Sequence, residues 1–392
     1  MIDKITDSCT GCRTCEKVCS KNCISMKPDM EGFLIATIDS NKCVDCGLCK
    51  KYCPQNTIIV NKSPLEVYAI RTKDNKLLKR SSSGGIFAAV AKLVLDGGGV
   101  VFGAAYNNNM QVEHVCINSS SELWRLQSSK YVQSNTKNTY VEAKEMLEKG
   151  LYVLYSGTPC QIAGLNSYLK RKYDNLITID IVCHGVPSPK IFAKYIEWKS
   201  KEFGAPLQYC NFRDKADGWG QTLTFMTTSP TCKKQSIIGP SDPYYYHFLQ
   251  GNLHRKCCYN CLYASKYRPA DMTIGDYWGI EREHKKLFSY KGVSLLMLNN
   301  QQTVDFFRKI KNDFIYEKST YEKASRRNYN LKYPSKKGNK RDIIYKRIDE
   351  LTVEEYFNGL SCPQTIKNRI KAIIPSKIRL FIKILKTYAC RC

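Results

Sequence analysis

Two closely spaced cysteine runs near the N-terminus constrain this chain more than any other feature of its sequence. The first run is Cys9, Cys12, Cys15 and Cys19, and the second is Cys43, Cys46, Cys49 and Cys53. Three cysteines at successive intervals of three wrap one corner of a cubane iron-sulfur cluster, whose fourth ligand then comes from elsewhere. Zinc ribbons use cysteine pairs separated by a longer loop, so two zinc sites are the weaker interpretation. Exchange of the fourth ligands predicts one 4Fe-4S cluster on Cys9, Cys12, Cys15 and Cys53 and a second on Cys43, Cys46, Cys49 and Cys19.

The surroundings of the two runs fit a small redox module in a reducing compartment. Of the 20 cysteines, nine lie before residue 62, a density that indicates metal or redox chemistry rather than a disulfide scaffold. The N-terminus has no basic segment followed by an apolar stretch, and no run of about 18 apolar residues exists, so we expect a cytoplasmic protein. Ser20 stands where proline commonly follows the run, and we expect Cys23 to be a spare core thiol. The module resembles a bacterial-type ferredoxin, which implies that it carries single electrons at low potential.

The rest of the chain divides by composition into a central domain and two basic segments. Apolar runs at 151–155 and 176–183 indicate buried strands, and the stretches 161–172 and 189–203 indicate helices. Strand followed by helix, twice over, favours parallel pairing. The expected fold class is α+β and α/β, with a small bacterial-type ferredoxin domain followed by an α/β domain. The expected domains are residues 1–62, residues 63–300, a basic extension at 301–355 and a basic amphipathic tail at 356–392.

A turn rich in serine and glycine precedes an apolar helix in the central domain. Its residues are Ser81, Ser82, Ser83, Gly84 and Gly85, and the helix is expected over 86–95. Serine and glycine at a helix N-terminus offer free backbone N–H groups and close approach, which suit a phosphate or a pyrophosphate. Serine capping of an ordinary buried helix is the other interpretation.

Further cysteines follow the two predicted strands. Cys160 comes just after the first strand and Cys183 just after the second. Ligand sites in α/β sheets gather at the carboxyl ends of strands, so both cysteines should point into the same crevice. With Cys258 and Cys261 they could complete a third 4Fe-4S cluster; scattered buried thiols plus a zinc-binding pair is the alternative. His184 is either a proton relay or a hydrogen-bonded structural histidine.

Six ordered motifs between residues 65 and 300 are similar to those of a known family. They are Arg80 to Ile86, Ser129 to Ser134, Ser156 to Gln161, Cys183 to Pro189, Phe212 to Lys215 and Gly275 to Gly279. Together they resemble the beta subunit of coenzyme F420-reducing hydrogenase and its dehydrogenase relatives, with the ferredoxin module fused in front. The resemblance implies a flavoprotein that binds FAD and favours the third cluster. It also implies that the Ser81–Gly85 turn, Lys130 and Tyr131 contact the flavin. Cys257 falls where relatives usually have a small residue, so the ligand role is assigned to Cys258.

The resemblance implies an iron-sulfur flavin-dependent oxidoreductase. Clusters move one electron at a time and hydride chemistry needs two, so a flavin is the natural converter. The implied path runs from ferredoxin or flavodoxin through the clusters and FAD to a deazaflavin (coenzyme F420) or a small organic substrate. Arg213, Lys215 and Lys130 either neutralise a phosphate or a reduced flavin, or are surface or salt-bridged cations. No catalytic residue is identified.

The sequence leaves the substrate class and one alternative function open. Bacterial relatives often accompany genes of surface-polysaccharide synthesis, which suggests a substrate class without identifying the substrate. The alternative function is a non-catalytic electron-transfer subunit of a larger redox complex, whose substrate site lies on a partner.

The charge of the chain is strongly positive, at +26. No nucleic-acid-binding module is present and the basic tail has little aromatic interleaving, so we expect no nucleic-acid partner and, instead, steering of acidic electron carriers. Residues 356–392 contain eight basic and no acidic residues, with apolar residues at helical spacing in two segments that Pro375 separates. Peripheral contact with the inner membrane face is one interpretation. A helix that packs its apolar stripe on the flavin domain or on a second subunit is the other.

Overall fold

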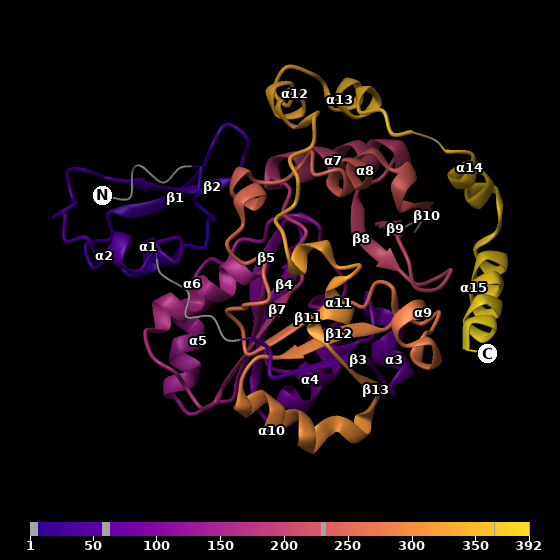
Figure 1. The fold of residues 1–392 in the computed structure, drawn as a ribbon. Coiled ribbons are helices and arrows are strands. Elements are labelled where there is room, and N and C mark those ends of the chain that lie inside the picture. The colour runs from indigo at the N-terminus through magenta and orange to yellow at the C-terminus, as the bar shows by residue number, and fades with distance from the viewer. Residues whose placement is uncertain (1–6, 57–62, 229–232, 364, 392) are drawn as a thin grey trace.

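The structure, a computed structural model, describes residues 7–56, 63–228, 233–363 and 365–391, so the boundary expected at residue 62 lies outside the described residues (Figure 1). The N-terminal module contains a hairpin of β1 (Ile24–Pro28) and β2 (Leu34–Ile38), and two one-turn helices, α1 (Thr14–Lys17) and α2 (Leu48–Lys51). Both helices follow a residue in the left-handed region, Arg13 at φ 68° and Gly47 at φ 72°. Each helix holds the third cysteine of its run, so the repeated spacing produces a repeated turn.

A mixed sheet forms the centre of the molecule, with eight strands among the described residues, in the order β13-β3-β12-β11-β7-β6-β4-β5. The strands are β3 (Glu66–Thr72), β4 (Val100–Tyr106), β5 (Val112–Ile117), β6 (Val153–Gly157), β7 (Leu176–Ile181), β11 (Met272–Asp276), β12 (Ser294–Leu298) and β13 (Phe314–Ser319). The predicted parallel pairing is confirmed for β6 and β7, and β4 and β11 extend it on either side. The outer strands are antiparallel. One edge strand, β13, comes from the segment expected to be a basic extension.

Helices cover both faces of this sheet. Helices α4 (Ile86–Asp96) and α10 (Gln301–Ile310) share a hydrophobic core with one face, and α5 (Thr139–Glu148) and α6 (Pro159–Leu169) share another core with the opposite face. Burial on both faces explains why the parallel strands are almost continuously apolar. A capping box between Thr158 and Gln161 starts α6 directly after β6. The first turn of α6 therefore holds Cys160 close to the carboxyl end of β6.

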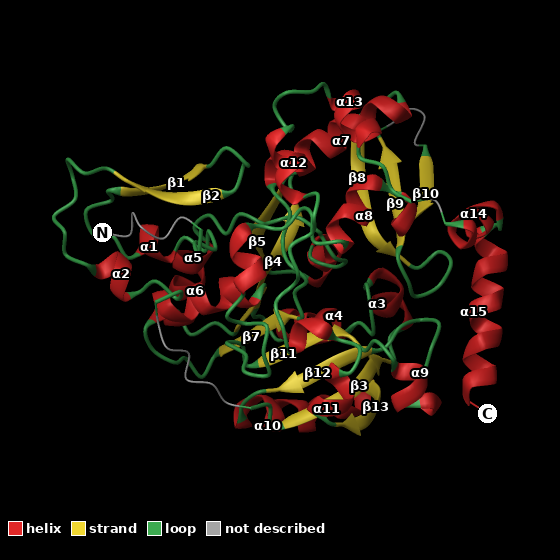
Figure 2. Cartoon of the chain, turned by 45° about the horizontal axis from the view of Figure 1, so that its top comes forward, coloured by secondary structure: helices red, strands yellow, loops and turns green. Residues whose placement is uncertain are grey.

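A second, three-stranded sheet lies beside the first (Figure 2). It consists of β8 (Leu207–Asp214), β9 (Thr222–Thr227) and β10 (Lys234–Ile238), and it packs with α7 (Pro189–Phe203), α8 (Pro243–Leu249), α12 (Arg341–Lys346) and α13 (Val353–Gly359). The core between these elements is rich in aromatic rings, such as Tyr195 and Tyr244, which stack at 4.5 Å. Three shorter helices are α3 (Asn75–Arg80), α9 (Ile280–Glu283) and α11 (Tyr321–Ser325).

Buried arginines fasten the N-terminal module to the central domain. Arg255 donates to the carbonyl of Cys9 at 2.7 Å, to that of Leu34 at 2.9 Å, and to Gln133 at 2.9 Å. Arg341, at 1% exposure, forms a bidentate ion pair with Glu31 in the β1–β2 turn. These bonds fix the distance between the cysteine runs and the large sheet.

Two helices, α14 (Ile366–Ile373) and α15 (Ser376–Arg391), end the chain, and Pro375 separates them as predicted. They lie on the side of the molecule opposite the N-terminal module (Figures 1 and 2). The interpretation that the whole apolar stripe of α15 packs back on the central domain is wrong, because most of the stripe is exposed, while Arg379 and Lys383 contact the protein beside the half-buried Leu380 and Ile384. Within the described residues, no helix has the length and apolar character needed to cross a membrane.

Candidate functional site

The structure brings together the four thiols predicted to hold the first cluster. Burial raises the pKa of Cys15, and the neighbouring Cys12, Cys9 and Cys53 raise it further. Burial also raises the pKa of Cys53 to about 11, again with contributions from Cys12 and Cys9. Thiols gathered in this way are the donor set that the positively charged core of an iron-sulfur cluster requires, because metal binding releases their protons. These residues therefore fit the group that their spacing predicts.

The second thiol set lies nearer the surface and contains five cysteines rather than four. Cys43 and Cys46 both act on the pKa of Cys49, which burial raises. Cys19 and Cys23 lie 3.3 Å apart at their sulfur atoms. The bond with Cys19 raises the pKa of Cys23 to about 12, and Cys43 also raises it. Cys23 is buried as expected, but it lies inside the thiol set.

A third group of thiols forms at the carboxyl ends of β6 and β7. Burial raises the pKa of Cys160, and Cys183, Cys257 and Cys261 add to the effect. Burial likewise raises the pKa of Cys183 to about 12. Cys258 lies beside Cys257, whose hydrogen bond raises the Cys258 pKa. All four residues predicted for a third cluster are thus in one place, together with Cys257.

A tyrosine connects the first and third thiol groups. Tyr263, at 1% exposure, follows Cys261 by two residues, and its pKa is raised by burial and by thiols of both groups. Gln55, two residues after Cys53, donates to the Tyr263 hydroxyl at 3.4 Å. Arg268 donates to the Tyr263 carbonyl and, at 3.2 Å, to the buried Asp180 on β7. The first and third groups are therefore neighbours, and the second group lies outermost, with Cys46 exposed.

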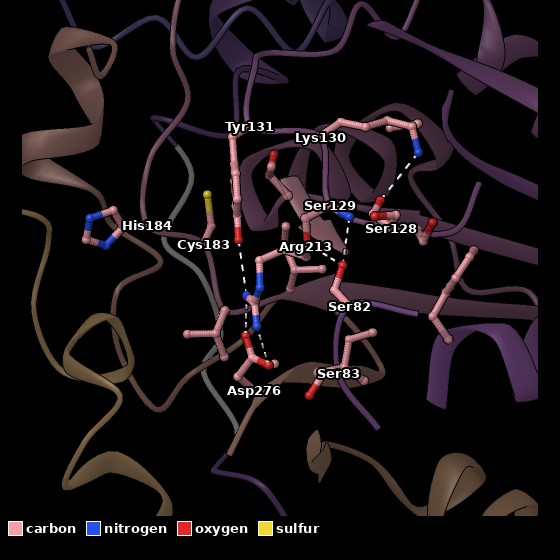
Figure 3. A pocket seen from close by; sticks show the side chains of 18 of the residues that line it. Ser82, Ser83, Ser128, Ser129, Lys130, Tyr131, Cys183, His184, Arg213 and Asp276 are labelled. Atoms are coloured by element: carbon pink, nitrogen blue, oxygen red, sulfur yellow. Dashed lines mark hydrogen bonds and ion pairs between the residues drawn. The ribbon is translucent and has the colours of Figure 1, made fainter. Parts of the chain in front are cut away.

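A cavity of about 520 Å³ adjoins the third thiol group, between the two sheets. Cys160 and Cys183 line it, so the expectation that both cysteines face one crevice is confirmed. Most of the predicted flavin contacts line it as well, namely Ser81, Ser82, Ser83, Gly85, Lys130, Tyr131 and Arg213. Figure 3 shows Cys183 on one side of this space and Ser82 and Ser83 on the other.

Two motifs that are distant in the sequence meet in the wall of the cavity. The Ser129 N–H donates to the Ser82 hydroxyl at 2.8 Å, and the two hydroxyls lie 2.9 Å apart (Figure 3). Gly85 begins α4 at φ +82°, where a Cβ atom would lie 2.8 Å from the Thr72 side chain. Glycine at this position thus permits the turn that directs the N-terminus of α4 at the cavity.

Lys130 is a half-buried cation in the lining of the cavity. Its ammonium donates to the carbonyls of Gln127 at 3.0 Å and Ser128 at 3.4 Å, and no carboxylate pairs with it among the described residues. Burial lowers the pKa of Lys130 to about 7. A neighbouring negative charge favours the protonated form, so an anion in the cavity would restore the charge of this lysine.

The charge of Arg213 is already compensated. Its guanidinium forms a bidentate pair with Asp276 at 2.7 and 3.1 Å, and it donates to the Tyr131 hydroxyl at 3.2 Å (Figure 3). Trp219 donates to the same carboxylate at 2.7 Å and stacks on Trp278 at 5.1 Å. Arg213 therefore shapes this wall and holds Tyr131, while its charge is shared with Asp276.

Gly84, Lys215 and His184, which the sequence motifs singled out, have contacts that are typical of structural residues. Gly84 packs under the cavity wall, where a Cβ atom would lie 2.4 Å from the Ile70 carbonyl. Lys215 donates to the carbonyls of Leu78 and Ser83, outside the cavity, and burial lowers its pKa to about 7. Both ring nitrogens of His184 have partners, Asn330 at 2.9 Å and the Leu249 carbonyl at 3.3 Å. His184 thus has the hydrogen-bonded environment of a structural histidine.

Other cavity residues carried no usable signal in the sequence. His114 on β5 lies between the Ser134 hydroxyl at 2.8 Å and the Ser156 carbonyl at 2.9 Å, and burial lowers its pKa to about 4. The segment 327–330 also lines the cavity. It lies in a basic stretch without a motif, and only the position of β13 brings it there.

Comparison with known proteins agrees with these observations in two parts of the chain. Residues 8–57 match the 4Fe-4S dicluster domain, and residues 151–324 match the family described as the C terminus of the beta subunit of coenzyme F420 hydrogenase/dehydrogenase. A chain of the xenon-derivatised F420-reducing [NiFe] hydrogenase complex from Methanosarcina barkeri aligns at 14% identity and a TM-score of 0.43, over 76% of this chain and 92% of its own length. No curated protein matches significantly.

The cysteine runs and the dicluster match define an iron-sulfur protein of the electron-transfer class, with two 4Fe-4S clusters in a ferredoxin-like domain. Within this class, residues 151–324 are similar to the C terminus of the beta subunit of coenzyme F420 hydrogenase/dehydrogenase.

Proposed function

We propose that this chain is an iron-sulfur flavoprotein oxidoreductase that passes electrons between its ferredoxin-type clusters and FAD, and then to a deazaflavin (coenzyme F420) or a small organic substrate. The observation that carries the proposal is the shared cavity. Cys160 and Cys183 line it together with the serine turn and the start of α4, and Figure 3 shows Cys183 across the space from Ser82 and Ser83. A cofactor bound there would touch the third thiol group directly.

Different residues of the cavity would serve different parts of a bound cofactor. Bound clusters would carry single electrons, and bound FAD would accept them singly and deliver hydride. The Ser82–Ser129 pair and the start of α4 would hold the pyrophosphate, and Lys130 would supply the positive charge. Arg213 would keep Tyr131 in place. The apolar part of the lining, with Ile179 and Phe248, would exclude water from the ring system.

The same proposal includes a third 4Fe-4S cluster on Cys160, Cys183, Cys258 and Cys261. Its support is the grouping of these thiols beside the cavity, and the neighbourhood of Tyr263 and Gln55, which links them to the first cluster's thiols. Arg268, buried beside Cys183 and Cys261 and paired with Asp180, would share its positive charge between that carboxylate and a cluster at this place.

Cofactor analysis of protein purified without oxygen tests both parts. We expect about twelve irons and one FAD per chain, because three clusters of four irons are proposed. A fully reconstituted preparation that stops near eight irons, or that holds zinc firmly in their place, would contradict the third cluster. Protein that binds no flavin at any concentration would contradict the cavity assignment.

An electron-transfer subunit without its own substrate site is the second candidate, favoured by the family's description as a beta subunit. Turnover separates the two candidates. The oxidoreductase reduces coenzyme F420 or a small substrate with reduced ferredoxin or flavodoxin and no further subunit. In the electron-transfer subunit, the same donor reduces the bound FAD, but no substrate is reduced until a partner protein is added. Substrates from surface-polysaccharide synthesis belong in the first assay.

A further inference from the structure

The C-terminal helices carry a surface that electron transfer does not use. Helix α14 packs beside β10, and α15 packs beside the turn at Lys285–Leu287. Both helices lie on the side of the molecule opposite the N-terminal module (Figures 1 and 2).

The face of α15 that contacts the protein carries the polar contacts of this helix, beside the half-buried Leu380 and Ile384. Arg379 and Lys383 pair with Asp217 at 2.9 and 3.7 Å. Thr387, one turn further, is 3% exposed, and the Cys390 thiol donates to the Glu281 carbonyl at 3.3 Å. Residues separated by three or four positions lie on one side of a helix. These contacts place Arg379, Lys383, Thr387 and Cys390 on the side of α15 that faces the protein.

The opposite face of α15 is apolar and faces away from the protein. Its side chains are between 38% and 63% exposed, and they are Ile378, Phe381, Ile382, Leu385 and Tyr388. Helix α14 adds Ile366, Ile370 and Ile373, which are 54% to 82% exposed. A surface helix of a soluble domain normally buries its apolar stripe, so a contiguous exposed stripe marks an interaction surface.

The charges around this stripe indicate the kind of partner surface that it fits. On a helical projection at 100° per residue, Lys377 and Lys386 lie at the two edges of the stripe, and both are exposed. Residues 356–392 contain no acidic side chain. A second copy of the chain would bring like charges together, whereas a surface with dense negative charge and an apolar interior would satisfy both features. We propose that α14 and α15 lie in the interface of a bilayer rich in anionic lipid, with the apolar stripe inserted.

Co-sedimentation with vesicles tests this proposal independently of any redox activity. The full chain should bind vesicles of phosphatidylcholine with about one-third phosphatidylglycerol at low salt, and should bind pure phosphatidylcholine at least about tenfold less tightly. The double variant Phe381→Ser/Leu385→Ser, which removes the centre of the stripe, should lose about tenfold or more in affinity. Ile343→Ser is the matched control, because Ile343 is 55% exposed on α12 and should leave binding unchanged.

A second variant keeps the test valid if the first one misfolds. Lys377→Glu/Lys386→Glu changes no apolar contact and should weaken binding to the anionic vesicles by about tenfold or more. Cluster absorbance reports that each variant is folded. The proposal is overturned if the wild-type chain stays in the supernatant with anionic vesicles, or if both double variants bind as the wild type does. It is also overturned if sedimentation velocity shows a dimer that the Phe381→Ser/Leu385→Ser change dissociates.

Discussion

We predict that Lys130 makes the binding of an anion in the cavity depend on pH. Burial lowers the pKa of Lys130 to about 7, and a bound anion raises it again. Below pH 7 the lysine is already protonated, so the affinity for an anionic ligand should be nearly constant. Above pH 7 binding must take up a proton, so the affinity should fall by about tenfold per pH unit until the pKa of the complex is reached.

Flavin titration of flavin-free protein between about pH 6 and pH 9 measures this slope. In Lys130→Gln the affinity should be lower at pH 6 and independent of pH. The control is Lys92→Gln, which removes an exposed lysine on α4 that pairs with Asp96 and should leave the slope unchanged. A pH-independent affinity in the wild type would show that Lys130 does not meet the anion.

Two adjacent cysteines offer a second test at the scale of the residue. We predict that Cys258→Ser loses about four irons and that Cys257→Ser loses none, since Cys258 is assigned to the third cluster. Cys257 is the competitor, because it interacts with both Cys160 and Cys261. Iron analysis of the two variants decides the assignment, and the reverse result would transfer the ligand role to Cys257. Cys23→Ser should retain all irons, although Cys23 lies beside Cys19.

Among the elements, the N-terminal hairpin and its cysteine runs are docked in part by Arg255. Arg255→Met leaves the Cys9 and Leu34 carbonyls without their donor in a buried interface, which should cost about 2 kcal/mol or more. Hydrogen exchange in residues 7–38 should then be at least about thirtyfold faster. The neighbouring Lys256→Met removes only an exposed contact with Asp7 at 3.3 Å, so exchange should stay near the wild-type rate. Equal protection in both variants would mean that other contacts hold the module.

The elements show what a sequence pattern can reveal and what it cannot. The stretch 189–203 coincides with α7, and the run at 176–183 contains β7, because local periodicity and apolar content determine these elements. The antiparallel strands β12 and β13 were not predicted, since their place beside β3 depends on pairing with residues over 200 positions away, although β12 coincides with an apolar run. The same reason hid the cavity residues 327–330. The cysteine sets were predictable because ligand spacing is local, whereas Cys257 and Cys23 needed the fold to place them.

At the scale of the whole molecule, the positive charge should govern encounter with the electron carrier. The outermost thiol set has the exposed Cys46, and Lys42, Lys50 and Lys51 are exposed near it in the sequence. Reduction by an acidic ferredoxin or flavodoxin should be fast at low salt. It should slow as the Debye length falls from about 30 Å at 0.01 M to about 10 Å at 0.1 M salt.

Stopped-flow reduction at the two salt concentrations measures this effect. Lys50→Glu/Lys51→Glu should lower the second-order rate constant at 0.01 M salt, whereas Lys337→Glu, on the exposed segment before α12, should change it little. A rate constant that stays flat across the salt range would exclude electrostatic steering.

The ion pair between Arg341 and Glu31 joins residues 310 positions apart. This separation means that the N-terminal module is translated well before its partner residue on the central domain. A ribosome adds about 5 to 20 residues per second, so Glu31 precedes its partner by roughly 15 to 60 s. During that interval the N-terminal module is already translated while part of the surface that will receive it does not yet exist. Iron and sulfide can therefore reach the cysteines of this module before it docks on the central domain. The ion pair between Arg341 and Glu31 can form only after this interval, in which the clusters have time to assemble.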